Sequence, residues 1–408
     1  MNIKEIETIL TDTTYVRMAG TNEELICAKY LQQRCDELKI KNWLEPFPVL
    51  RAEIHRETLF ADGQQIPCMS YFGCGTGEVE APLYHLTGKT TLDYKRCRGK
   101  IVLSEERMGF WHYQDILDNG AVGFITYAGD INCADRDIDR RCLRENFTER
   151  GKIPGVMVHV KDAVELARTM PASVRICVDQ TPYNAESHNV IAELPGECDE
   201  WIILSAHYDS VSRSVGSYDN MSGCIAILSA AEYFTTHRHR YGLRFIWCGA
   251  EEGGLQGSIA YCVAHQAELD NILLDINVDM VGSIMGPFYA DCTAEDRLTH
   301  YLQYLADEVG VCAEAKNAVH SSDSTPFAGY GVPSLTFTRN APMGTASIHD
   351  RYDTAALLSA EQLRADAAFI TLFAERMANA ALFPVKREIP ENLQKVIDCY
   401  LDRRRDID

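Results

Sequence analysis

Polar side chains follow three apolar segments of the sequence at the point where each segment ends. WIILSA is followed by His207 and Asp209, LRFIWCGA by Glu251 and Glu252, and DINV by Asp279. In folds built on buried parallel strands, ligands bind in the crevice at the carboxyl ends of the strands. We therefore expect these five side chains to lie close together.

The kind of site follows from the residue types. Adjacent carboxylates such as Glu251 and Glu252 repel one another in a crevice of low dielectric unless cations neutralise them. A donor set that mixes imidazole with carboxylate suits Zn²⁺ best, with Mn²⁺ or Co²⁺ as alternatives, whereas Mg²⁺ and Ca²⁺ prefer oxygen alone. The sequence thus predicts a zinc site.

Asp219 and His349 extend this hypothesis to two ions. Asp219 lies in GSYDNMSG, on a turn before a predicted helix, and a carboxylate with two oxygens can bridge two metal ions. Two ions need more than one histidine. His349 is the best second candidate, because it follows a strand-like run and the loop APMGTAS and has Asp353 four residues further on.

Taken in order, these residues resemble the M28 family of metallo-aminopeptidases. The resemblance rests on His207-x-Asp209, Asp219-Asn220-x-Ser222-Gly223, Glu251-Glu252-Gly253, Asp279, Ser322-Asp323 with Pro326-Phe327, and His349-x-x-x-Asp353-Thr354. It implies a phosphorylase/hydrolase-like α/β domain with two zinc ions that act together in an aminopeptidase.

The resemblance also implies a ligand set for each ion. Asp219 would bridge the two metals. His207 and Asp279 would complete the site of one ion, and Glu252 and His349 that of the other.

Other residues receive roles beside the ligands. Glu251 is implied as the general base, and Asp209 would orient His207 through its other ring nitrogen. Asp353 would do the same for the second histidine, and Asp323 would support the pocket. We expect all of them within one crevice.

The expected reaction is hydrolysis of the first peptide bond of a peptide with a free N-terminus. A water molecule that bridges two Zn²⁺ ions loses its proton readily, so the nucleophile would be a metal-bridging hydroxide. Glu251 would hold that proton and pass it to the leaving amine. The free α-amino group would bind near the second ion, which would restrict cleavage to the chain end.

Three alternatives stay open. A metal-dependent carboxypeptidase or an N-acyl amino acid amidohydrolase on the same fold needs a cationic pocket for a carboxylate, which Arg339 or Arg351 could supply. A related acyltransferase that cyclises N-terminal glutamine shares the fold, but we expect it to use a single zinc ion. A catalytically inactive, peptidase-like binding protein would have lost ligands that this sequence keeps.

The elements that must position the site alternate between strand and helix over residues 184–385. The apolar segments NVIAEL, WIILSA, LRFIWCG, DINVDMVG and SLTFT alternate with predicted helices from Ser222 to about Phe234 and after Gly254. Continuous apolar strands between amphipathic helices indicate a mixed, mostly parallel sheet with helices on both faces. The predicted fold class is a doubly wound α/β domain.

Three further regions surround this domain. Residues 1–50 are expected to be its N-terminal part, with a helix that begins at the capping-box pair Thr21 and Glu24. Residues 51–183 read as an inserted, small β-rich domain, whose segments GKIVLS, GAVGFITYAG and IPGVMVHV are similar to the protease-associated (PA) domain. We expect residues 386–408 to form a C-terminal helix and tail.

The composition restricts which partners and which cellular compartment we expect for the protein. The chain has 408 residues, 46% of them hydrophobic, and its formal net charge of −20 argues against a nucleic-acid partner. Charged or hydroxyl residues interrupt every apolar run near the start, so we expect neither a signal peptide nor a membrane span. Fifteen cysteines without a CxxC pair are typical of buried thiols in a reducing compartment. We expect a cytoplasmic protein, and a homo-oligomer is compatible with the sequence.

Overall fold

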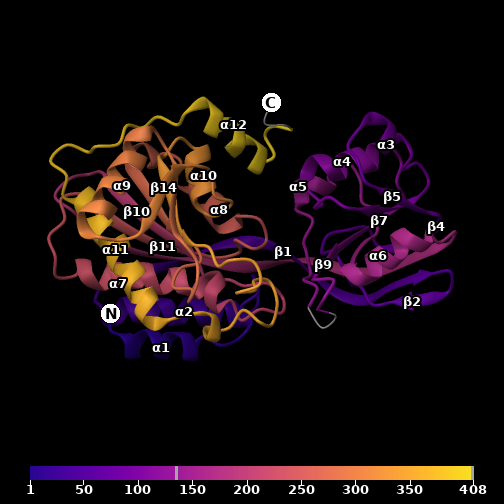
Figure 1. Ribbon diagram of the computed structural model, residues 1–408, viewed down its shortest axis with the longest axis horizontal. Helices are drawn as coiled ribbons and strands as arrows, with labels where there is room; N and C mark the ends of the chain where they lie inside the picture. The colour runs from indigo at the N-terminus through magenta and orange to yellow at the C-terminus, as the bar shows by residue number, and fades with distance from the viewer. Residues whose placement is uncertain (134–136, 406–408) are drawn as a thin grey trace. The chain divides into compact units, whose positions relative to one another are not determined.

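The chain forms two compact units, each with a core of its own. The computed structural model describes residues 1–133 and 137–405 (Figure 1). The larger unit comprises Met1–Phe47 and Glu186–Asp408, and the inserted unit comprises Pro48–Ala185. These bounds lie within a few residues of the predicted 51–183 insertion. Each unit has its own cluster of buried hydrophobic residues.

A mixed sheet forms the centre of the larger unit. Its strand order is β14-β13-β15-β12-β10-β11-β9-β1. Parallel pairs join β10 to β11, β10 to β12, β12 to β15 and β13 to β14, whereas β13 with β15 and β9 with β11 are antiparallel. The strands are β1 (Lys41–Ala61), β9 (Val174–Leu194), β10 (Trp201–His207), β11 (Gly242–Cys248), β12 (Ile272–Val278), β13 (Phe288–Thr293), β14 (Ala313–Asn317) and β15 (Ser334–Arg339). The prediction of a mixed, mostly parallel sheet is confirmed.

Helices cover both faces of this sheet, which explains why its central strands are apolar almost throughout. Successive side chains of β10 enter different cores, since Ile202 and Leu204 belong to one buried cluster and Ile203 to another. The first face carries α1 (Ile3–Asp12), α2 (Asn22–Glu37), α7 (Ser222–Phe234), α9 (Asp296–Val309) and α11 (Ala360–Ala378). The second carries α8 (Gln256–Ala264) and α10 (Ser324–Gly329), against which α12 (Glu391–Tyr400) packs. Short helical turns lie at η1 (Ser217–Met221), η2 (Leu269–Asn271) and η3 (Ala355–Leu357).

The start of α2 shows how local sequence signals are used. Thr21 caps the helix, and its side chain accepts a hydrogen bond from the backbone N–H of Glu24. The Glu24 carboxylate in turn accepts bonds from the backbone N–H of Gly20 at 2.6 Å and from the Ser187 hydroxyl at 2.5 Å. Glu24 therefore connects the helix start to β9.

The inserted unit contains more helix than the predicted β-rich domain. Its sheet has the order β3-β8-β7-β6-β5, and the pairs from β5 to β8 are parallel. Parallel neighbours need crossover connections, which are usually helical. The strands are β3 (Met69–Ser70), β5 (Leu83–Leu86), β6 (Ile101–Ser104), β7 (Gly123–Ala128) and β8 (Gly155–His159), with helices α3 (Thr91–Lys95), α4 (Phe110–Asp118), α5 (Glu145–Thr148) and α6 (Val160–Thr169). Strands β2 (Gln64–Ile66) and β4 (Gly77–Ala81) pair with the parts of β1 and β9 that belong to this unit.

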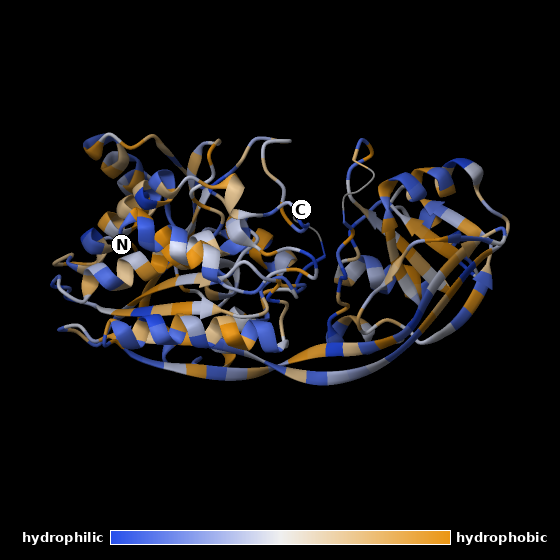
Figure 2. Cartoon of the chain, turned by 90° about the horizontal axis from the view of Figure 1, so that it is seen from below, coloured by the Kyte–Doolittle hydropathy of each residue, from blue (hydrophilic) through white to orange (hydrophobic). Residues whose placement is uncertain are grey.

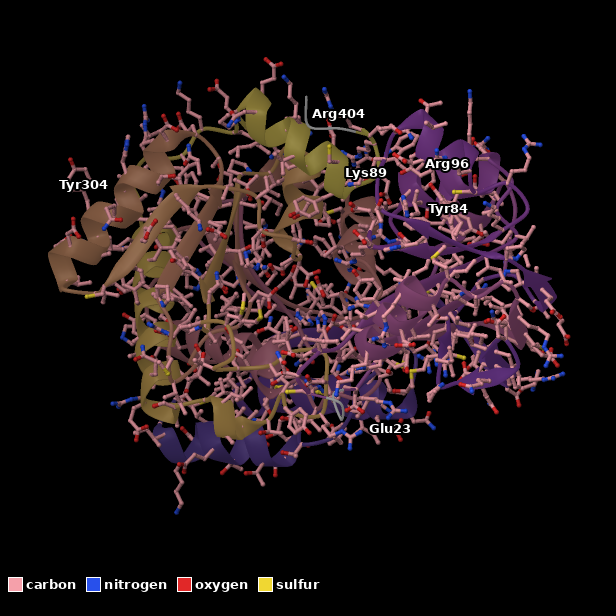
Figure 3. The ribbon with its side chains drawn as sticks, turned by 45° about the vertical axis from the view of Figure 1, so that its right-hand side comes forward. Glu23, Tyr84, Lys89, Arg96, Tyr304 and Arg404 are labelled. Atoms are coloured by element: carbon pink, nitrogen blue, oxygen red, sulfur yellow. The ribbon has the colours of Figure 1, made fainter. Side chains whose placement is uncertain are left out.

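Hydropathy follows this architecture. Hydrophobic residues are concentrated on the strands of the inserted unit (Figure 2). Polar residues lie at the surface, such as Lys95, Arg96 and Arg98 around the end of α3, of which Figure 3 labels Arg96. Among the described residues, no helix has both the length and the apolar character needed to cross a membrane.

The first prediction tests the core beneath β10. Leu204 is fully buried, and Leu204→Ala should lower the free energy of unfolding by about 2–5 kcal/mol, because it removes buried methyl groups and leaves a cavity. Chemical denaturation measures the change. The matched control is Leu382→Ala, since Leu382 is 87% exposed and its truncation should change stability by less than about 0.5 kcal/mol. Equal losses in the two variants would contradict the placement of Leu204.

Candidate metal centre

The ends of three adjacent strands bring the predicted site residues together. Strand β10 pairs with β11 on one side and with β12 on the other. His207 is the last residue of β10, Glu251 and Glu252 follow the end of β11, and Asp279 follows the end of β12. His207 and Asp279 are buried. The order of strands in the sheet therefore converts three distant sequence segments into one cluster.

The donor atoms fall into two groups that share Asp219. The His207 Nε2 atom lies 3.1 Å from Asp219 Oδ1 and 3.5 Å from Asp279 Oδ1. The His349 Nε2 atom lies 3.2 Å from Asp219 Oδ2 and 3.1 Å from Glu252 Oε2. Within each group of three residues, the ligand atoms lie within 4.8 Å of one another. Asp219 thus offers one oxygen to each group.

Several of these donor atoms lie close to other polar atoms but make no well-aligned hydrogen bond. Within residues 1–133 and 137–405, both ring nitrogens of His207 and the Oδ1 atom of Asp279 are buried and accept or donate no hydrogen bond. Buried polar atoms in proteins are nearly always hydrogen-bonded. The Nε2 atom of His207 and the Oδ1 atom of Asp279 lie around one point with the carboxylate of Asp219, and a divalent cation requires such a set of nitrogen and oxygen donors, so the residues fit a metal.

The electrostatics of the cluster lead to the same conclusion. Burial alone would lower the pKa of His207, but the surrounding carboxylates, led by Glu251, hold it well above its ordinary value. Burial opposes ionisation of Asp219 as well, yet its bonds to both histidines keep the pKa of this carboxyl far below its usual range. Burial raises the pKa of Glu251, and the charge of Glu252 adds to the increase. The histidines and the carboxylates thus depend on one another for charge compensation, which divalent cations would also supply.

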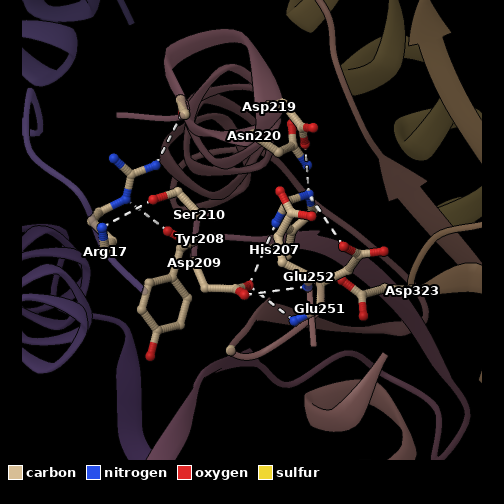
Figure 4. A network of polar contacts seen from close by, with 12 residues as sticks. Arg17, His207, Tyr208, Asp209, Ser210, Asp219, Asn220, Glu251, Glu252 and Asp323 are labelled. Carbon is tan, nitrogen blue, oxygen red and sulfur yellow. Dashed lines mark hydrogen bonds and ion pairs between the residues drawn. The ribbon is translucent and has the colours of Figure 1, made fainter. Parts of the chain in front are cut away.

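Asp209 holds two parts of the site at once. One of its oxygens lies 3.5 Å from the Nδ1 atom of His207, the nitrogen that faces away from the cluster. The same carboxylate accepts hydrogen bonds from the backbone N–H groups of Glu251 at 2.9 Å and Glu252 at 3.2 Å (Figure 4). The contact with His207 is the one that the sequence led us to expect. The bonds to the glutamate backbone carry no sequence signal.

Asp353 supports a ligand other than the one we expected. Its carboxylate accepts hydrogen bonds from the backbone N–H groups of Tyr218 at 2.8 Å and Asp219 at 3.1 Å. It therefore positions the shared carboxylate of Asp219, whereas the sequence suggested that it would orient His349. The expectation used only the distance along the chain, and the fold places Asp353 against the η1 turn.

Asp323 lies buried beneath the site. Its Oδ1 atom accepts a bond of 2.6 Å from the hydroxyl of Ser258 on α8, and burial raises the pKa of Asp323 to about 7. This position at the start of α10 agrees with a supporting role in the pocket.

Arg339 lies outside the cluster, contrary to the suggestion that it could bind a substrate carboxylate. Its Nε and Nη2 atoms donate to the two oxygens of Asp366 at 2.8 Å and 2.6 Å, and Nη1 donates to the carbonyl of Gly286. Every nitrogen of the guanidinium is therefore engaged within the protein. Arg351, which is exposed, is the other arginine that the sequence suggested for this purpose.

Asn220 is a site residue for which we had assigned no role. Its Nδ2 donates to the carbonyl of Val278 at 2.8 Å, and its Oδ1 accepts from the backbone N–H groups of Gly223 at 2.9 Å and Met280 at 3.1 Å. The Asn220 side chain therefore fixes the turn that carries Asp219 to the end of β12, beside Asp279.

Unusual backbone conformations accompany the ligands. Ala250 immediately precedes Glu251, Met280 immediately follows Asp279, and both have positive φ, at 55° and 59°. His349 itself has φ of 62°. Such left-handed conformations are costly for residues other than glycine and tend to occur at functional sites. The strain here lies at the bends that aim the ligands.

The fold and the site together define a class of protein: an α/β protein with a candidate metal centre at the carboxyl ends of its strands. Residues 189–374 match peptidase family M28. The part of the chain that holds the site thus resembles family M28.

Two curated proteins that are similar to part of this chain are named as aminopeptidases. Leucine aminopeptidase 2 of Trichophyton rubrum is 36% identical over 208 residues, which cover 48% of this chain and 40% of that protein. An aminopeptidase of Pseudomonas aeruginosa is 34% identical over 167 residues, which cover 40% of this chain and 31% of that protein. The chain therefore spans about two fifths of the length of the curated leucine aminopeptidases it matches.

Solved structures resemble nearly the whole chain. BSAP, a zinc aminopeptidase from Bacillus subtilis, has a TM-score of 0.77 and 23% identity, with 95% of this chain and 99% of that one covered. An aminopeptidase from Aneurinibacillus sp. strain AM-1 has a TM-score of 0.76 and 22% identity, with 94% and 96% covered. At this level of identity, the likeness shows the fold.

The second prediction tests the shared ligand. Asp219→Ala should lower the zinc content per chain more than Asp279→Ala, because Asp219→Ala removes the carboxylate that both groups of donors share, whereas Asp279→Ala affects one group. Elemental analysis of protein dialysed against a small excess of zinc measures the ions per chain. Asp199→Ala is the matched control, since Asp199 is exposed and outside the site, and it should keep the full content. Wild-type metal content in Asp219→Ala would contradict the shared role.

Proposed function

We propose that the protein is a zinc-dependent aminopeptidase that removes the N-terminal residue of peptides. One observation carries the proposal: Asp219 directs its two oxygens to two different histidines, while Glu251 lies beside them and belongs to neither group of ligands. This arrangement provides for two cations and leaves a carboxylate available for proton transfer. The names of the relatives point to the same activity.

Two zinc ions fit the two groups of donors, with Mn²⁺ or Co²⁺ as alternatives. His207, Asp219 and Asp279 would hold one ion, and Asp219, Glu252 and His349 the other. When bound, such a pair of ions supplies Lewis acidity, which lowers the pKa of water and polarises the carbonyl group of a substrate.

Glu251 is the proposed general base. Its Oε2 atom lies 4.0 Å from His207 Nε2, and its backbone is fixed by Asp209. In this position Glu251 takes a proton from the attacking water and then donates it to the nitrogen of the departing amine. The Glu251 carboxylate is half-buried and belongs to neither group of donors, so it is available to bind a proton and return it once cations neutralise the site.

We infer that the site recognises a substrate amine and not a substrate carboxylate. The free α-amino group of a peptide would bind near the second ion, as the sequence led us to expect. Arg339 is occupied by Asp366, so the structure offers less support for the alternative of a carboxypeptidase or an N-acyl amino acid amidohydrolase. We therefore assign chain-end specificity to the free amino group.

Three expectations from the sequence are kept as further proposals. They are the likeness of the inserted unit to a PA domain, a cytoplasmic location, and a homo-oligomeric state without nucleic-acid or membrane partners. Size measurement in solution and localisation of the tagged protein test the last two.

The third prediction concerns Glu251. Glu251→Gln should keep both metal ions but lower kcat by about 10²–10⁴-fold, because the amide cannot accept the proton. Steady-state kinetics together with metal analysis separate the two effects. Glu23→Gln is the matched control, because Glu23 is exposed at the start of α2 (Figure 3), and this variant should retain full activity. Wild-type turnover in Glu251→Gln would refute the assignment of the base.

The fourth prediction concerns the substrate. Aminoacyl amides with a free α-amino group should be hydrolysed, and the same amides with an N-acetyl group should not, because acetylation removes the anchoring amine. A chelator should abolish the activity, and added Zn²⁺ should restore it. Cleavage of the acetylated compounds alone would replace the aminopeptidase with a deacylase.

A further inference from the structure

Arg17 is a fully buried arginine whose guanidinium binds backbone rather than a carboxylate. Its exposed fraction is 0%, and its five guanidinium hydrogen bonds all end on carbonyl oxygens. A buried cation is costly unless its donors are satisfied. The carbonyls around Arg17 supply this compensation, so their positions and that of the guanidinium depend on one another.

The carbonyls on one side of Arg17 belong to the segments that carry two metal ligands (Figure 4). Its Nε atom donates to the carbonyl of Tyr208 at 2.7 Å, and Tyr208 directly follows His207. Its Nη2 atom donates to the carbonyl of Gly216 at 3.0 Å, three residues before Asp219. One side chain therefore binds both ends of the loop that connects these ligands.

The remaining bonds anchor Arg17 itself. Its Nη1 atom donates to Val215 on the ligand loop at 2.5 Å and to Thr13 and Tyr15 of its own segment at 3.0 Å and 3.2 Å. The guanidinium is therefore fixed against the end of α1. Movement of the loop from Tyr208 to Gly216 would therefore break bonds to a side chain that is anchored at the end of α1.

Ser210 adds a second connection between the same segments. The backbone N–H of Arg17 donates to the Ser210 hydroxyl at 2.9 Å, and the backbone N–H of Ser210 donates to the carbonyl of Arg17 at 3.2 Å. The Ser210 hydroxyl donates to the carbonyl of Ser214 at 2.9 Å. The loop is thus bound along its length and not only at its ends.

The packing around Gly216 leaves little freedom. Gly216 has φ of 54°, and a Cβ atom there would lie 2.5 Å from the Asp219 carbonyl oxygen and 3.0 Å from the Arg17 Nη2 atom. The turn is therefore in close contact with the guanidinium on one side and with the ligand residue on the other.

We propose that Arg17 is a positioning residue of the metal centre. Its guanidinium binds both ends of the loop from Tyr208 to Gly216, and its backbone binds Ser210 within that loop. Through both connections Arg17 sets the separation of the His207 and Asp219 donor atoms and so increases the affinity for the cation that they share. This inference rests on the proposed function of these residues as metal ligands. The planar guanidinium is essential, because the single ammonium of lysine cannot reach carbonyls in all these directions.

The test compares Arg17→Lys with Arg244→Lys. Arg244 serves as the control because it is also a buried arginine, with an exposed fraction of 6%. Its partners are Glu193, Tyr261 and Glu268, which lie outside the loop from Tyr208 to Gly216. Zinc affinity is measured on metal-free protein by competition with a chromogenic chelator, and the ligand geometry is read from the visible absorption spectrum of the Co²⁺-loaded protein.

We expect Arg17→Lys to bind the cation about 10–100-fold more weakly, the usual effect of losing a residue that orients metal ligands, and to show an altered Co²⁺ spectrum. Arg244→Lys should lose stability but keep the wild-type affinity and spectrum. Wild-type affinity in Arg17→Lys overturns the inference. Equal losses in both variants also overturn it, because they would reflect general destabilisation.

A second variant covers the case in which Arg17→Lys does not fold. Ser210→Ala keeps the guanidinium and removes only the hydroxyl connection, so it should weaken zinc binding by a smaller factor and leave the fold intact. Unchanged affinity in Ser210→Ala then overturns the inference. If the wild-type protein binds no zinc, the proposed function fails and this inference with it, whereas zinc binding that is insensitive to Arg17 and Ser210 refutes the inference alone.

Discussion

The larger unit must compensate the negative charge of several carboxylates that lie close together with little exposure to water. Asp209, Asp219, Glu252 and Asp279 are carboxylates at one edge of the sheet, in surroundings where uncompensated charge is expensive. Compensation comes from several directions. Imidazole groups face Asp219, and backbone N–H groups face the carboxylate of Asp209. The cluster exists because the fold provides these partners, and the proposed cations would complete the compensation.

The central sheet fixes the positions of the residues at its strand ends. Strand β10 is bonded on both sides and buried on both faces, so the position of His207 is determined by the backbone of three strands. The ligands beyond the strand ends lie on turns, and these need extra fixation. Asp353, Asn220 and Arg17 provide it through hydrogen bonds to backbone groups. Side chains outside the two groups of donors thereby position the site.

The parts of this arrangement that could be predicted from the sequence are those with a local signal. Apolar runs that end in His207, Glu251 and Asp279 marked the strand ends, and the helix over Ser222–Phe234 was predicted at its observed bounds. The partners of Asp353 and Arg339 could not be predicted, since they are backbone groups or residues brought close only by tertiary folding. Strand β14 and helix α3 were missed because their short or partly exposed segments lack a clear period, whereas α6 was missed although its sequence has a distinct apolar face.

The connection between the two units has a consequence for the order of folding during synthesis. Residues 48–185 form one uninterrupted stretch with its own core, so all partners of that core are available once the stretch has been made. Arg17, by contrast, is separated from Tyr208 by 191 positions. The first 47 residues must therefore wait for the later part of the chain, and the adjacent strands β1 and β9 shorten that search by holding the ends of the insertion together.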